Sequence, residues 1–89
     1  MLGSKLKLDE KRVRPLYEIA QEIRSDWKNI YFGAKPYLGA MLTMKSIDEK
    51  YMCDSGRTIV SYFLANACSW RGEVARRVKK ELNQMLKEK

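Results

Sequence analysis

The 89-residue sequence contains no histidine and only two cysteines, two prolines and five glycines. The absence of histidine excludes Ser-His-Asp and Cys-His catalysis, and it excludes every metal site that relies on imidazole. Cys53 and Cys68 are too few for the disulfide framework of a small secreted domain or for the four ligands of a structural zinc. Cys68 lies in an apolar stretch, where we expect a small buried hydrophobic side chain. The sequence therefore indicates a cytoplasmic protein without a cofactor or a metal.

Long hydrophobic runs and catalytic motifs are also missing. No apolar run approaches the roughly 18 residues of a membrane span, and the N-terminus has no signal-peptide core, so we expect no membrane partner. No glycine-rich phosphate loop is found, and the acidic residues between positions 48 and 54 lack the spacing of a calcium loop. Without histidine or a paired-carboxylate motif, the sequence does not predict an enzyme.

The charge that is present is unevenly distributed. Eighteen Lys and Arg against eleven Asp and Glu give a net charge of +7. Residues 1–14 carry five basic and two acidic side chains, residues 71–89 carry seven and three, and the middle of the chain carries six of each. Positive charge at both ends points to nucleic acid or another polyanion as a partner. The alternative is that Lys and Arg only solvate exposed helix ends.

Apolar periodicity predicts an all-α protein, a compact four-helix arrangement with a flexible basic N-terminal arm. The arm is expected at residues 1–12 and a single helical domain at 13–89. The one β-like run, at residues 29–32, is too short to found a sheet, and residues 29–33 are expected to form a loop. The expected helices cover residues 14–28, 36–45, 56–68 and 70–87, with a single helical turn at 46–51.

Local signals indicate where these helices begin. Pro15 and Pro36 suit first helical positions, where a missing N–H costs nothing. Asp54 or Ser55 is a suitable N-cap for the third helix, and Ser69 is one for the fourth. Ser46 and Glu49 have the capping-box spacing that predicts the single turn. The residues expected to face the core are Leu16, Ile19, Ala20, Ile23, Trp27, Ile59, Val60, Phe63, Leu64, Ala67, Trp70, Val74, Ala75, Val78, Leu82, Met85 and Leu86.

Basic residues recur on one face of the expected C-terminal helix, opposite its apolar stripe. Four polar positions follow at i, i+4, i+7 and i+11, and such a face could track successive phosphates. Binding of that kind is salt-dependent and mostly independent of sequence. The alternative is the solvated outer face of a bundle helix. With the basic arm included, the candidate nucleic-acid-binding residues are Lys5, Lys7, Arg76, Arg77, Lys80, Asn83 and Lys87.

Two further features suggest binding surfaces. The helices expected at 56–68 and 70–87, joined through Ser69, have the order of a helix-turn-helix with the fourth helix as the reader. Tyr31 and Phe32 are expected to be exposed in the loop beside Gly33, and they are the candidate partner-binding residues. Exposed aromatic rings serve as protein hot spots, and they also stack on nucleobases.

Four stretches of the sequence carry a resemblance to other proteins. Residues 26–29 (DWKN), 34–41 (AKPYLGAM), 63–67 (FLANA) and 70–79 (WRGEVARRVK) resemble segments of small hypothetical proteins encoded by phages and prophages of Gram-positive bacteria. The resemblance covers roughly residues 13–88 and includes no catalytic motif. It implies an intracellular accessory protein of a mobile element, and it assigns no residue a role.

Three functions are compatible with these observations. The first is a small non-enzymatic accessory protein that binds nucleic acid through its basic C-terminal helix and N-terminal arm. The second is a protein-binding module, such as a phage protein that modulates a host machine. The third is a structural bundle that forms a homodimer. The basic ends favour the first function, and the aromatic loop and small size favour the second.

Overall fold

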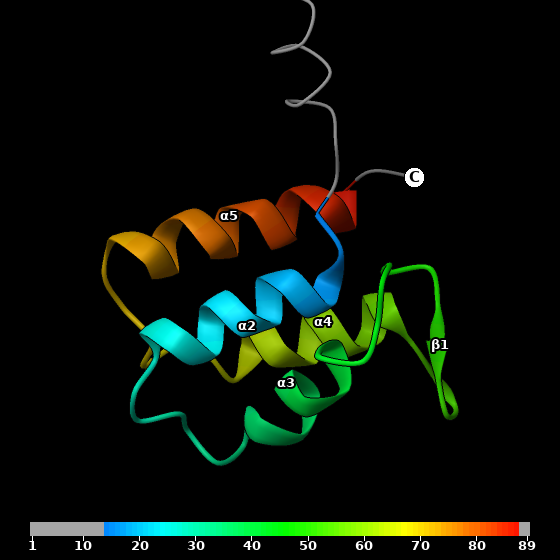
Figure 1. Cartoon of the computed structure of the whole chain (residues 1–89), viewed down its shortest axis with the longest axis horizontal. Coiled ribbons are helices and arrows are strands. Elements are labelled where there is room, and N and C mark those ends of the chain that lie inside the picture. Colours follow the sequence, from blue (N-terminus) through cyan, green and yellow to red (C-terminus); the bar gives the residue numbers. More distant parts are fainter. Residues whose placement is uncertain (1–13, 88–89) are drawn as a thin grey trace, which may run out of the picture.

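Four helices and one short β-hairpin make up residues 14–87, the part of the chain that the computed structural model describes. Helix α5 runs antiparallel to α2 and α4, and α3 lies on the other side of α2 and α4 from α5 (Figure 1). The elements in chain order are α2 (Leu16–Asp26), α3 (Lys35–Met41), β1 (Lys50–Tyr51), β2 (Asp54–Ser55), α4 (Gly56–Ala65) and α5 (Glu73–Lys87).

The predicted helical arrangement is confirmed in outline, but the protein is not strictly all-α. In place of the predicted helical turn at 46–51, β1 pairs with β2 in an antiparallel hairpin whose tip is Met52 and Cys53. Ser46 and Glu49 stabilise a turn here: the Ser46 hydroxyl accepts from the Asp48 N–H at 2.9 Å, and the Glu49 carboxylate accepts from the Lys45 N–H. The capping-box residues thus satisfy backbone donors of a turn, and no helix follows.

Each helix is shorter than its sequence pattern predicts. Three of the helices end early, and α5 begins late. Helix α2 stops at Asp26, since the Trp27 backbone is extended. Helix α4 stops at Ala65, and the Asn66 side chain donates to the Tyr62 carbonyl at 2.8 Å. Helix α3 ends at Met41, four residues before the predicted end.

The start of α5 corrects a second prediction. Gly72 has φ +112°, so the helix begins at Glu73 and Ser69 is not its cap. The connection from α4 spans residues 66–72, longer than the three- to four-residue turn of a helix-turn-helix, and the two helices it joins run antiparallel (Figure 1). The helix-turn-helix interpretation is therefore wrong. The predicted cap at Ser55 is confirmed, since its hydroxyl accepts from the Thr58 N–H.

The core lies between the four helices and is built from the predicted apolar stripes. Trp27 and Trp70 stack with ring centroids 5.8 Å apart, and Phe63 meets Trp27 edge-on at 6.2 Å. Cys68 departs from its prediction: it lies in the connection that follows α4, and it is exposed. The buried apolar residues are Leu16, Ile19, Ala20, Ile23, Trp27, Ala34, Leu38, Ala40, Met41, Met44, Ile47, Ile59, Val60, Phe63, Ala67, Trp70, Ala75, Val78, Leu82 and Met85, with Leu64, Val74 and Leu86 partly buried.

Within residues 14–87, no helix combines the length and the apolar character needed to cross a membrane. The same range contains no group of three or more His, Cys, Asp or Glu side chains arranged to hold a metal ion.

Candidate nucleic-acid interface

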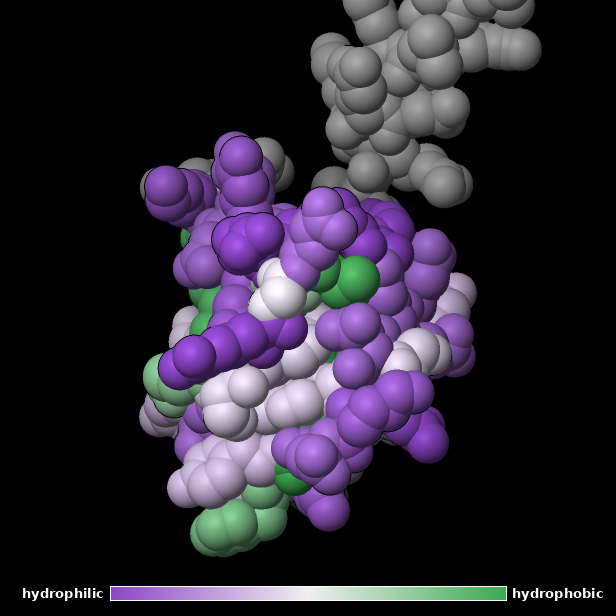
Figure 2. Space-filling view, turned by 90° about the vertical axis from the view of Figure 1, so that its left-hand side faces the viewer, coloured by the Kyte–Doolittle hydropathy of each residue, from purple (hydrophilic) through white to green (hydrophobic). Residues whose placement is uncertain are grey.

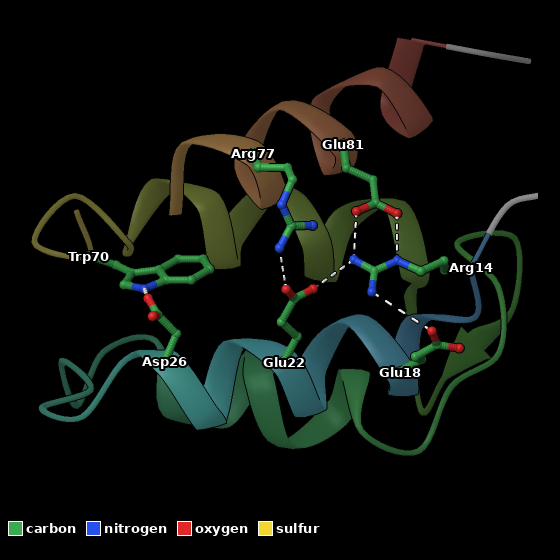
Figure 3. A network of polar contacts seen from close by, with 7 residues as sticks. All are labelled: Arg14, Glu18, Glu22, Asp26, Trp70, Arg77 and Glu81. Atoms are coloured by element: carbon green, nitrogen blue, oxygen red, sulfur yellow. Dashed lines mark hydrogen bonds and ion pairs between the residues drawn. The ribbon is translucent and has the colours of Figure 1, made fainter. Parts of the chain in front are cut away.

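An acidic stripe on α2 faces α5 and determines which basic residues stay available. Glu18, Glu22 and Asp26 recur at i, i+4 and i+8, so they lie on one face of the helix. Figure 3 shows these three carboxylates pointing toward partners from outside α2. Asp26 accepts a hydrogen bond from the Trp70 indole N–H at 2.8 Å. The stripe therefore joins α2 to the C-terminal part of the chain through polar contacts.

Arg14 is the centre of this polar contact set. Its guanidinium makes a two-pronged contact with Glu81 of α5 at 2.7 and 2.9 Å, and it donates to Glu22 at 2.9 Å. A longer ion pair of 3.8 Å links it to Glu18. The Glu81 contact raises the pKa of Arg14 above its ordinary value, so the group stays charged. Arg14 thus pins the start of the described chain against α5.

Arg77 completes the same cluster from α5. Its guanidinium donates to Glu22, so one carboxylate receives two arginines (Figure 3). The hydrogen bond from Arg77, and then the one from Arg14, hold the pKa of Glu22 below its ordinary value of 4.5. Arg77, one of the predicted nucleic-acid-binding residues, is therefore turned toward α2 and partly neutralised there.

Acidification is expected to weaken the fold by protonating Glu22. The folded pKa is depressed, so the ionised carboxylate stabilises the fold above the unfolded pKa, and that contribution is lost as the pH falls through the folded value. Urea unfolding from about pH 7 down to about pH 2 should show the free energy of unfolding falling from about pH 5. Glu22→Gln should flatten this dependence, whereas Glu18→Gln, which removes only the 3.8 Å contact, should keep it nearly intact. A Glu22→Gln protein with the wild-type pH profile would show that another group causes the acid sensitivity.

The remaining predicted basic residues of α5 lie together on its outer face. Arg76, Lys80 and Lys87 are exposed, and at about 100° per residue their positions fall within an arc of about 40°. Asn83 lies at the edge of this arc, and its side-chain amide donates to the Lys79 carbonyl of the same helix. We call Arg76, Lys80 and Lys87 the outer stripe of α5. Within the described residues, no acidic side chain forms an ion pair with any of its three members.

The other predicted site residues belong to the N-terminal segment and to the loop before α3. Lys5 and Lys7 lie outside the described residues. The described chain begins at Arg14, whose contact with Glu81 brings it to α5. Tyr31 and Phe32 are exposed as predicted, and their ring centroids lie 4.9 Å apart. The segment between α2 and α3 that carries them lies at the opposite end of the molecule from the β-hairpin (Figure 1).

Two features of this region, a contact and a cavity, were not predicted from the sequence. Lys79 donates to the Trp70 carbonyl at 2.7 Å, and its ammonium lies 5.9 Å from the Trp70 ring centroid. A surface cavity of about 320 Å³ lies beside Tyr31, lined also by Ala65, Asn66, Cys68 and Ser69. Both arise from chain segments that meet only after folding, so no local pattern signals them. The acidic stripe of α2 was not predicted either, although its i, i+4, i+8 spacing is a signal that could have indicated it.

Comparison of the chain with protein families, with curated proteins and with solved structures gives no significant match in any of the three.

Proposed function

We propose that this protein is a small non-enzymatic accessory protein that binds nucleic acid through the outer stripe of α5. The observation that carries the proposal is the division of α5 between two kinds of cation. Arg77 is turned toward α2 and paired with Glu22, whereas Arg76 and Lys80 are exposed with no acidic partner among residues 14–87. A cytoplasmic location follows from the same function.

The spacing of the outer stripe suits a phosphate backbone. With a rise of about 1.5 Å per residue, Arg76 and Lys80 lie about 6 Å apart along the helix axis, and Lys87 lies about 10 Å further on. Such a row of cations can meet several phosphates along one strand, and it reads no base directly. The described residues contain thirteen Lys and Arg against eight Asp and Glu, a net charge of +5 that favours polyanions.

The place where the N-terminal residues join the domain supports the same surface. Arg14 is fixed to Glu81, which lies one residue after Lys80 in α5. The segment that precedes Arg14 carries Lys5 and Lys7, and it connects to the domain at a residue that contacts α5. We include this segment in the proposed binding surface for that reason.

Removing two members of the outer stripe should weaken nucleic-acid binding and reduce its salt dependence, because fewer phosphates are neutralised. The slope of log affinity against log salt is roughly −0.9 per neutralised phosphate on duplex DNA. Arg76→Ala combined with Lys80→Ala is therefore expected to flatten the slope by about two. Fluorescence anisotropy with a labelled oligonucleotide, measured from about 50 to 200 mM salt, gives this slope directly.

A matched double variant separates a local surface from overall charge. Lys45→Ala with Lys50→Ala removes the same two charges from exposed positions at and beside the β-hairpin. This protein should keep a slope close to that of the wild type. Equal losses in both double variants would show that net charge alone drives binding. No binding by the wild type at about 50 mM salt and micromolar protein would end the proposal.

The alternative function is a module that binds another protein and uses Tyr31 and Phe32 as its anchor. It is favoured by the Phe32 side chain, which is 74% exposed although large aromatic groups tend to be buried. This alternative predicts that Phe32→Ala leaves nucleic-acid binding unchanged. Titration of Phe32→Ala with single-stranded and duplex nucleic acid tests this expectation.

A further inference from the structure

The end of the molecule opposite the β-hairpin carries an exposed pair of aromatic rings. The Tyr31 and Phe32 ring centroids are 4.9 Å apart with the planes tilted by 58°, and the side chains are 46% and 74% exposed. Each ring therefore has surface available for a further flat group. Figure 2 looks at this end and shows a pale to hydrophobic area at the lower left, with hydrophilic surface above it and to its right.

The Tyr31 ring packs close to the backbone of Gly33 and shares a cavity with residues at the end of α4. A Cβ at Gly33 would lie 2.5 Å from the Tyr31 ring and 2.9 Å from the Asn66 side-chain oxygen, so only glycine allows this close approach. The cavity of about 320 Å³ opens between Tyr31 and Asn66, and Ser69 also lines it. The Tyr31 ring lies beside the cavity, and amide and hydroxyl groups are on the cavity wall. Such a surface suits a planar, hydrogen-bonding ligand.

The charged residues around this end are predominantly basic. Lys28, Lys35 and Arg71 are exposed and lie within four residues of the aromatic pair or the cavity wall in the chain. None of the three forms an ion pair among the described residues. Two carboxylates also lie at this end: Asp26 accepts from the Trp70 indole, and Glu73, four residues after Ser69, is exposed at the start of α5. The surface therefore complements a ligand that combines flat rings with negative charge.

We propose that this aromatic end stacks the bases of a single-stranded nucleic acid, whose phosphates continue along Arg71 to the outer stripe of α5. The inference rests on the proposed function and names its ligand class. Residues 66–72 link the cavity wall to the start of α5, so in the chain Arg71 lies between Ser69, which lines the cavity, and Arg76 of the outer stripe. Bases of a duplex are already stacked on one another, whereas those of a single strand are free to stack on protein rings.

The test compares single-stranded and duplex ligands of equal length. Wild-type protein is titrated with about 20-nucleotide dT and rU oligonucleotides, which separate DNA from RNA, and with a duplex of mixed sequence at about 50 mM salt. We expect Phe32→Ala to weaken binding to the single strands by about 5- to 100-fold and to change duplex binding less than about twofold. Phe32→Trp should restore single-strand binding, because a larger ring offers more stacking area.

A control and a direct stacking readout accompany the titration. Met52→Ala removes a side chain that is 85% exposed at the tip of the β-hairpin, and it should leave all affinities unchanged. An oligonucleotide carrying 2-aminopurine reports base stacking through its fluorescence, and Phe32→Ala should abolish the change seen with the wild type. Circular dichroism confirms that each variant is folded.

The outcomes for the two proposals are distinct. If the wild type binds neither single strands nor duplex, the proposed function itself fails. If it binds both with equal affinity and Phe32→Ala changes nothing, the outer stripe of α5 is retained and the stacking surface is overturned. That second result would assign Tyr31 and Phe32 to a protein partner.

Discussion

Replacing Phe63 with alanine is expected to lower the free energy of unfolding by about 3–5 kcal/mol. Phe63 is completely buried on α4 and meets the Trp27 ring edge-on, while Trp27 stacks on Trp70. Truncation leaves a cavity beside the Trp27 indole, and the surrounding helices close it only in part. For a domain of this size the loss approaches the whole free energy of unfolding.

Urea unfolding followed by circular dichroism and by tryptophan fluorescence measures this effect. Tyr62→Ala, one residue away on the same helix, is the matched control, because its side chain is 50% exposed and its main ring contact is Tyr37 at 5.4 Å. The control should lose about 0.5–1.5 kcal/mol. Equal losses in the two variants would show that α4 does not carry the core.

The helices and their buried faces could be predicted from the sequence because both follow from one period. Positions such as Ile19, Ile23, Val78 and Leu82 recur every three to four residues, and all four are buried. The ends of the helices could not be predicted in the same way. The α5 start, for example, depends on Gly72 in a positive-φ conformation and on Trp70 turning into the core.

The β-hairpin shows the limit of local signals. Ser46 and Glu49 have a spacing that serves either a helix start or a tight turn, and the structure uses it for the turn. Nothing in residues 50–55 has the Asn-Gly or Asp-Gly signal of a two-residue hairpin, and Met52 adopts φ +58° without being glycine. The hairpin forms where the chain must return to begin α4.

The candidate site was predictable only as far as one helix face extends. The exposed positions of Arg76, Lys80 and Lys87 follow from the apolar stripe on the other side of α5. The pairing of Arg77 with Glu22 joins residues 55 positions apart, and it depends on how α2 and α5 pack. Helix periodicity predicts that a basic side chain lies on the surface, whereas tertiary packing decides whether a carboxylate pairs with it.

Replacing Gly56 with alanine is expected to destabilise the protein by about 1–3 kcal/mol or more. A Cβ at Gly56 would lie 2.7 Å from both the Cα and the carbonyl oxygen of Ile47, and backbone atoms cannot rotate away as a side chain does. The Gly56 N–H also donates to the Glu49 carbonyl at 2.7 Å, so the backbone at the start of α4 is fixed against residues 47–49. Relief of the clash must therefore separate α4 from this segment, and buried Ile47 would lose core contacts.

Gly39→Ala provides the opposite expectation within the same fold. Gly39 is exposed in the middle of α3, and a Cβ there would meet no atom within 4 Å. Alanine at that position should raise the free energy of unfolding by about 0.5–1 kcal/mol, because glycine loses more backbone entropy in a helix. Urea unfolding of the two variants tests the close approach directly. A Gly56→Ala protein as stable as Gly39→Ala would refute the packing of the Ile47 backbone on the start of α4, because neither glycine has a positive φ and only Gly56 lacks room for a Cβ.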